Sequence, residues 1–230
     1  MEYLEFERIL SAKRMQRYKD AANGDTRKAM ALYRNNLRLS QEMFTIVSCF
    51  EVALRNAIDG LLVTTLGDDW LRDSVQDNGI FSNGRMNETR KIIDKAYSRL
   101  NRQGIYSHSK LIAEMEFGVW KYMFSSLQYR ATGQCLLRAF PNKPRSSAAV
   151  QYNNTYIFNE LDKVNSLRNR IAHHEPICFR LHESEIDTSY IINEYQKIQT
   201  LFSWMGIDSH SMLYGLDHVQ SVCAKINSLK

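Results

Sequence analysis

The chain has 230 residues, of which 44% are hydrophobic, and it carries a formal net charge of +5 with the histidines uncharged. This length fits one domain, or one large domain with a subdomain, and the hydrophobic content is sufficient for a core, so a disordered chain is not the default expectation. No hydrophobic run reaches the roughly 18 residues that a membrane-spanning helix needs, so the sequence argues against a membrane protein. We therefore expect a single folded domain over residues 1–230.

Prolines and cysteines limit the fold class and the cellular compartment. The only prolines are Pro141, Pro144 and Pro176, and the absence of this helix breaker from the first 140 residues predicts an all-α fold. The four cysteines have no Cys-x-x-Cys spacing, and the acidic first residues lack the pattern of a secretory signal peptide. We therefore expect a cytoplasmic protein with reduced thiols, in which Cys49 and Cys135 lie in the core.

The N-terminal third is predicted to form two helices. The first covers residues 8–22 and the second, much longer, covers residues 25–66. Asn23-Gly24 is typical of a left-handed helix stop, and Asp25 can cap the helix that follows.

This region is also strongly basic. Between residues 11 and 40 there are eight basic and two acidic side chains, a larger excess than that of the whole chain. Such a surface attracts phosphate backbones, and it is equally typical of a solvated charged face. The residues that we consider for phosphate contact here are Lys13, Arg14, Arg17, Arg27 and Lys28.

The long helix carries an apolar stripe that predicts a place in the core, although Ser40 could begin a new segment of it. The members of this stripe are Phe44, Val47, Phe50, Leu54 and Leu61. Glu51 and Arg55 are four residues apart on a neighbouring face, where they can form a local ion pair. Alternatively, Glu51 orients side chains on a facing helix.

The rest of the chain is predicted to be helical with one main loop. Residues 72–84 are polar and form this loop. Middle helices follow over 85–140, and the aromatic residues of 107–129 are expected in the core. A helix with several reactive side chains lies within 147–176, and closing helices cover 188–229.

Residues 166–176 have the sequence SLRNRIAHHEP, which concentrates two guanidinium groups, a carboxamide, two imidazoles and a carboxylate. An apolar face at helical spacing precedes and enters this run, and it consists of Ile157, Leu161, Val164, Leu167 and Ile171. Pro176 disfavours the α conformation in the residue before it, so the helix is predicted to end by His174 or Glu175.

Arg168 and His173 supply a fixed positive charge and a group that exchanges protons near neutral pH. Asn169 and His173 are four residues apart and lie side by side, whereas Arg168 is rotated from His173 by about 140°. A long arginine side chain or a loosened last turn would close this gap. The alternative is structural: Arg168 pairs with a carboxylate, His173 caps helix carbonyls and His174 is a surface residue.

The string LRNRIAHHEP resembles the signature of the HEPN superfamily, an Arg and a His separated by a short spacer, and Arg168, Asn169 and His173 match it. Residues 50–58 (FEVALRNAI) and 111–120 (LIAEMEFGVW) are similar to further blocks of its Abi-like branch, the AbiD/AbiF type of bacterial abortive-infection proteins. The segment Ile177-Cys178-Phe179-Arg180 departs from the family pattern because it lacks a Trp-Asn pair.

The resemblance implies a HEPN-like helical bundle with additional N- and C-terminal helices, and a homodimer that brings two such motifs together. It further implies metal-independent RNA cleavage without a cofactor, by a toxin that an antitoxin protein or RNA restrains. Arg168 and His173 would be catalytic, and Asn169, His174, Glu51 and Arg55 would support them. The residues expected to bind RNA are Lys13, Arg14, Arg17, Arg27, Lys28, Arg170, Lys143 and Arg145.

In such a site a ribose 2′-OH attacks the adjacent phosphorus, and Arg168 holds the charge that builds on the phosphoryl oxygens. His173 takes the 2′-OH proton or gives one to the leaving oxygen, and Asn169 positions the phosphate or orients His173. One imidazole cannot easily do both, so two copies across a twofold axis make chemical sense. Two alternatives stay open: a catalytically silent module that binds RNA or protein, and a structural helical dimer.

Overall fold

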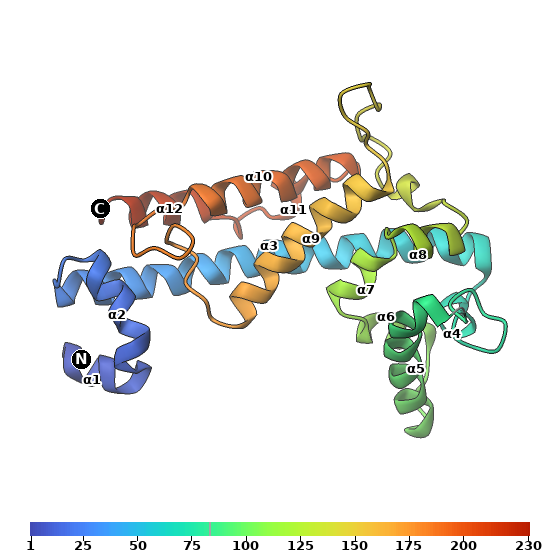
Figure 1. The fold of residues 1–230 in the computed structure, drawn as a ribbon, viewed down its shortest axis with the longest axis horizontal. Helices are drawn as coiled ribbons and strands as arrows, with labels where there is room; N and C mark the ends of the chain where they lie inside the picture. The colour runs from blue at the N-terminus through green and yellow to red at the C-terminus, as the bar shows by residue number, and fades with distance from the viewer. Residues whose placement is uncertain (83) are drawn as a thin grey trace. The chain divides into compact units, whose positions relative to one another are not determined.

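The computed structural model describes residues 1–82 and 84–230, and it is almost entirely helical (Figure 1). The predicted all-α fold is confirmed: within the described residues, the only β-structure is an isolated antiparallel bridge between Phe179 and Ile186. The α-helices, in chain order, are α1 (Tyr3–Leu10), α2 (Ala12–Ala21), α3 (Thr26–Leu66), α4 (Trp70–Asp73), α5 (Asn87–Arg102), α6 (His108–Glu114), α7 (Phe117–Tyr122), α8 (Ser126–Ala131), α9 (Asn154–Ala172), α10 (Ser189–Trp204), α11 (Ser209–Met212) and α12 (Val219–Asn227). Two short 3₁₀ helices, η1 (Gly84–Met86) and η2 (Leu136–Ala139), lie among them.

The chain forms two compact units. The first unit comprises Met1–Ser48, Ser166–Thr200 and Asp208–Lys230. The second unit comprises Cys49–Asn165 and Leu201–Ile207. Three long helices, α3, α9 and α10, therefore contribute residues to both units.

The N-terminal region of the first unit differs from the single predicted helix over 8–22. Ser11 has a φ of 78°, which interrupts the helix, and its hydroxyl oxygen accepts a hydrogen bond from the Arg14 N–H at 3.3 Å to start α2. The predicted stop at Asn23-Gly24 is confirmed, because both residues have positive φ. Asp25 caps α3 as expected by accepting bonds from the backbone N–H groups that follow it.

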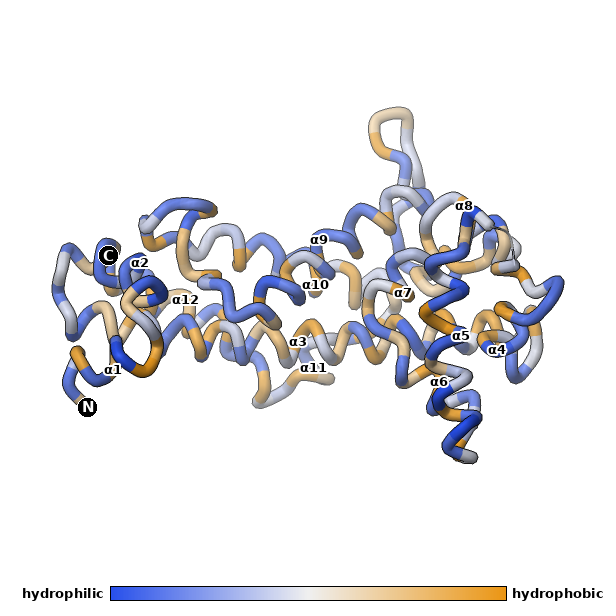
Figure 2. The backbone as a smooth tube through the Cα atoms, turned by 60° about the horizontal axis from the view of Figure 1, so that its bottom comes forward, coloured by the Kyte–Doolittle hydropathy of each residue, from blue (hydrophilic) through white to orange (hydrophobic). Residues whose placement is uncertain are grey.

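The predicted helix over 25–66 is confirmed as α3, and it runs without a break at Ser40. Its buried stripe is shifted from the predicted one: Phe44 is 47% exposed, and Met43 takes the buried position instead. The stripe consists of Leu32, Leu39, Met43, Ile46, Val47, Phe50, Leu54, Ile58 and Leu62. Hydrophilic and hydrophobic segments alternate along α3 and α5 in Figure 2, as expected for helices that bury one face.

In the second unit, the predicted helix over 107–129 is divided into α6, α7 and α8. Extended backbone at Met115, Glu116 and Ser125 separates the three pieces. The expectation that its aromatic residues lie in the core is confirmed for Phe117, Trp120 and Phe124, but it is wrong for Tyr122 of α7, which is 48% exposed. The predicted loop over 72–84 begins inside α4, and its Asn83 lies outside the described residues.

Two further expectations need correction. The closing region predicted to be helical over 188–229 forms α10 and two shorter helices, α11 and α12, with Gly215 in left-handed conformation between the last two. Cys49 and Cys135 are partly exposed, whereas Cys178 and Cys223 are buried, and all four are free thiols. None of the helices described in the structure is both long and hydrophobic enough to cross a membrane.

Candidate active site

The motif helix α9 ends in a compact hydrogen-bonded cap that exposes both histidines. His174 has a φ of 56°, the left-handed conformation that usually follows a helix. Its N–H donates to the Ile171 carbonyl at 3.0 Å, and the Glu175 N–H donates to the Arg170 carbonyl at 2.9 Å. This pair of bonds is a Schellman motif, and it ends the helix just before Pro176, close to the predicted position.

Arg168, Asn169 and His173 lie on the outer side of this last part of α9. Leu167 and Ile171 are buried, which turns the residues between and after them outward. Asn169 and His173 are exposed and Arg168 is partly exposed. The His173 N–H donates to the Asn169 carbonyl at 2.9 Å, so these two residues stack one helical turn apart as predicted.

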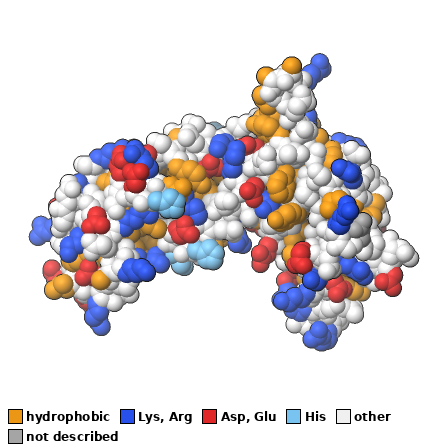
Figure 3. Space-filling view, viewed as in Figure 1, with side chains coloured by type: hydrophobic (Ala, Val, Ile, Leu, Met, Phe, Trp, Pro, Cys, Tyr) orange, Lys and Arg blue, Asp and Glu red, His pale blue; other side chains and the backbone are white. Residues whose placement is uncertain are grey.

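Arg168 keeps its charge available. One Nη atom lies 3.5 Å from the Asn169 side-chain oxygen, which is a long and weak hydrogen bond. Within the described residues of the first unit, no carboxylate forms an ion pair with Arg168, and the His173 and His174 side chains make no hydrogen bond. The structural alternative for Arg168, a carboxylate partner, is therefore not found in this unit. Histidine side chains are visible on the exposed face near the end of α9 (Figure 3).

Arg170 stabilises the end of the helix. Its Nε lies 3.2 Å from a Glu175 carboxylate oxygen, and it donates to the Pro176 carbonyl at 3.1 Å. The guanidinium also lies 5.1 Å from the centre of the Tyr190 ring. These contacts fix the turn that follows the motif, and the expected contact of Arg170 with RNA stays a prediction.

The segment after the motif is held by a buried asparagine on α3 that the sequence analysis did not single out. Asn36 is 3% exposed, and its side-chain oxygen accepts hydrogen bonds from the Ile177 N–H at 2.8 Å and the Cys178 N–H at 3.2 Å. The sequence did contain a signal for this role, because the carboxamide of Asn36 falls within the buried stripe of α3 and a buried polar group needs a hydrogen-bond partner. The family pattern is not followed in the segment that includes Ile177, Cys178 and Phe179, and these three residues are all buried.

Two arginines of α2 contact the backbone before and after this segment. The Arg14 guanidinium donates to the His174 carbonyl at 2.9 Å, and Arg17 donates to the Glu183 carbonyl at 2.8 Å. The Arg17 guanidinium also lies 4.8 Å from the centre of the Phe179 ring. Two of the basic residues considered for phosphate contact thus have structural partners.

The other predicted phosphate contacts differ in exposure. Lys13 and Arg27 are exposed, and Lys28 is partly exposed. In the second unit, Arg145 is exposed and Lys143 is partly exposed. RNA contact by these residues stays a prediction.

Glu51 and Arg55 belong to the part of α3 in the second unit. Both are partly buried, and the Arg55 Nε is buried without a hydrogen-bond partner in the described structure. Their supporting role for the motif stays a prediction.

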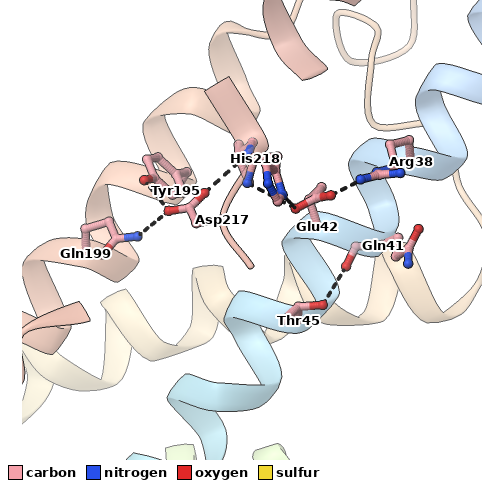
Figure 4. Close-up of polar contacts among 9 residues, drawn as sticks. Arg38, Gln41, Glu42, Thr45, Tyr195, Gln199, Asp217 and His218 are labelled. Atoms are coloured by element: carbon pink, nitrogen blue, oxygen red, sulfur yellow. Dashed lines mark hydrogen bonds and ion pairs between the residues drawn. The ribbon is translucent and has the colours of Figure 1, made fainter. Parts of the chain in front are cut away.

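A cluster of polar and charged side chains that includes His218 has a structural role in the first unit (Figure 4). The buried Glu42 carboxylate lies 2.9 Å from Arg38 Nε and accepts a bond from the His218 N–H at 3.1 Å, which fixes the start of α12 on α3. The Tyr195 hydroxyl donates to Asp217 at 2.6 Å. Burial and this bond raise the pKa of Tyr195 to about 12.

Among the residues that the structure describes, no group of three or more His, Cys, Asp or Glu side chains is arranged to hold a metal ion. A groove of about 870 Å³ lies along α5 to α8 in the second unit, and none of the predicted site residues lines it.

The family model of Abi-like proteins matches residues 2–178. The chain belongs to the Abi-like protein family. The match covers α1 to α9 and the whole motif, and it ends within the segment that Asn36 holds. No curated protein and no solved structure matches the chain. Membership in the Abi-like family associates the protein with abortive infection, a form of defence against phage.

Proposed function

We propose that this Abi-like protein is a HEPN-type endoribonuclease, acting without a metal as a toxin in abortive infection. The observation that carries the proposal is made at the capped end of α9, where Arg168 has no carboxylate partner among the described residues of its unit and the side chain of His173 is exposed. These two have surfaces open to a substrate.

The reaction proposed for this site is transesterification within RNA. The 2′-oxygen bonds to the adjacent phosphorus, the bond from phosphorus to the 5′-oxygen breaks, and the products end in a 2′,3′-cyclic phosphate and a 5′-hydroxyl. Arg168 stabilises the charge on the non-bridging oxygens. A neutral His173 accepts the 2′-hydroxyl proton, and a protonated His173 donates to the 5′-oxygen.

Because these two proton transfers require imidazoles in opposite states, we propose that a homodimer supplies one His173 from each subunit. Asn169 positions the phosphate, and His174 supports the motif through the helix cap. In the cell, an antitoxin protein or RNA would restrain the activity until infection.

The test is incubation of the purified protein with RNA in EDTA, beside Arg168→Ala, His173→Ala and the control His210→Ala. His210 is an exposed histidine outside the motif, so its removal changes the surface in a comparable way. We expect cleavage by wild type and His210→Ala only, with cyclic phosphate ends and no cleavage of DNA. Equal RNA binding by all four proteins without cleavage would instead identify a binding module, and cleavage by His173→Ala would refute the mechanism.

A further inference from the structure

A loop and a cluster of aromatic rings in the second unit form a surface that the motif does not explain. The loop of residues 142–153, which is the last part of the connection between η2 and α9, projects from the start of α9 in Figure 1. At its base lie Tyr152, Tyr156 and Trp204, from the loop, from α9 and from the end of α10. All three rings are partly exposed.

The three rings contact one another. Tyr152 lies 4.8 Å from Tyr156 and 5.6 Å from Trp204, and Tyr156 lies 6.0 Å from Trp204, between ring centres. The planes of Tyr152 and Trp204 meet at 89°, so this contact is edge to face and each ring retains a face that the other does not cover. The indole N–H of Trp204 has no hydrogen-bond partner in the part of the chain that is described.

The loop is fixed to this cluster at both ends. The Asn142 N–H donates to the Trp204 carbonyl at 2.9 Å, and the Tyr152 N–H donates to the Ser146 hydroxyl oxygen at 3.0 Å. Between these anchors lie Lys143 and Arg145. Figure 3 shows both basic and hydrophobic side chains near the tip of the projection, and further hydrophobic ones at its base.

We infer that the cluster Tyr152, Tyr156 and Trp204 is a stacking platform for unpaired bases of RNA, with Lys143 and Arg145 contacting the adjacent phosphates. Partly exposed aromatic rings beside positive charge are the combination by which proteins hold single-stranded nucleic acid. A protein ligand would use the rings and would have less need of the two cations. The choice of RNA rests on the proposed function, whereas the site itself does not depend on cleavage.

Tyr156 stays uncharged in this setting. Burial and the nearby Glu160 carboxylate raise the pKa of its phenol above the ordinary value of 10.0. A tyrosine phenol is uncharged at physiological pH even at its ordinary pKa, so the ring does not repel a phosphate. Glu160 itself pairs with Lys163, which reduces its effect on an approaching RNA strand.

Tryptophan fluorescence can test the platform without any substitution in it. The chain has three tryptophans, and Trp70 and Trp120 are 1% and 0% exposed, so quenching by an added ligand reports on Trp204. A single-stranded 2′-O-methyl oligonucleotide, which cannot be cleaved, should quench the emission. A duplex of the same sequence and an abasic strand should not. Absence of quenching by the single strand would overturn the inference.

Affinities of a labelled strand provide the second measurement. Because a stacked base contributes about 5- to 150-fold in affinity, Trp204→Leu should weaken binding by a factor in this range, whereas Trp204→Phe retains most of it. Replacing Lys143 and Arg145 by Met should flatten the salt dependence, with a slope lower by about 1.4. Equal binding by the Leu and Phe variants would also overturn the platform.

The outcomes separate this inference from the nuclease proposal. Quenching of Trp204 in a protein that cleaves no RNA would support the platform and reject the nuclease. Cleavage that depends on His173, in a protein whose Trp204 does not respond, would reject the platform and support the nuclease.

Discussion

Replacing Asn36 by Ala should destabilise the first unit although residue 36 lies far from the motif in the sequence. The Asn36 side-chain oxygen is the acceptor for the buried backbone N–H groups of Ile177 and Cys178, at 2.8 and 3.2 Å. An alanine leaves both donors without a partner. Because a buried orphaned donor costs about 1–3 kcal/mol and the second bond is long, we expect a loss of about 2–4 kcal/mol. For a chain of this length that corresponds to a melting temperature lower by about 5–15 °C.

The neighbouring residue provides a matched control. Asn35 donates to the Ala31 carbonyl of its own helix, at 2.8 Å, and leaves no buried group unpaired when it is truncated. Asn35→Ala should therefore change stability by about 0.5 kcal/mol or less. Asn36→Asp retains an acceptor oxygen and should fall between the two.

Thermal unfolding followed by circular dichroism compares these variants, and hydrogen exchange locates the effect. In Asn36→Ala the amides of Ile177 and Cys178 should exchange faster than in wild type, whereas in Asn35→Ala they should stay protected. If Asn36→Ala and Asn35→Ala melt together and both amides stay protected, the assignment of Asn36 as the anchor of this segment is wrong.

Three further predictions concern the proposed dimer, the Asp187 carboxylate and the cysteines. If a dimer needs His173 from both subunits, wild-type chains co-expressed with an equal amount of His173→Ala chains should cleave at about half the rate per wild-type chain, because about half of them pair with a variant chain. An unchanged rate per wild-type chain would exclude a shared site. The Ser189 N–H donates a hydrogen bond to the Asp187 carboxylate and holds the pKa of that carboxyl below its ordinary value of 3.8. The charged carboxylate therefore stabilises the fold at pH values above 3.8, and this stabilisation is lost as the pH falls through the lowered pKa. The stability difference between wild type and Asp187→Asn should accordingly be largest near neutral pH and disappear in acid, as measured by urea unfolding. Burial raises the pKa of Cys178 to about 12, so a thiol reagent at pH 8 should label Cys49 in the native protein and Cys178 only after unfolding.

The sequence was most informative where the interactions that decide the structure are local. Pro176 and the apolar spacing before it predicted the end of α9 because a helix cap involves only the last turn and the residues after it. Asp25 likewise capped the helix that it precedes. The break at Ser11 was missed, although it is local, because serine carries no preference for positive φ.

Contacts between distant parts of the chain could not be predicted. The partners of Asn36 and Arg17 follow the motif, more than a hundred residues along the sequence from them, and no local pattern specifies such a pairing. The shift of the buried stripe from Phe44 to Met43 has the same origin. Two adjacent residues near the edge of an apolar face fit the helical spacing about equally well, and only the packing of other elements decides which of them is buried.

The contacts of the motif region divide its residues into two groups with different expected effects of substitution. Asn36, Arg14 and Arg170 each contact the backbone of the segment that follows α9, so their loss should lower stability first and activity as a consequence. Arg168 and His173 contribute few contacts within the described part of their unit, so their loss should abolish chemistry while the melting temperature stays close to that of wild type. A site of this kind requires the rigid backbone from the first group, because side chains with so few contacts of their own are positioned mainly through the helix end that carries them.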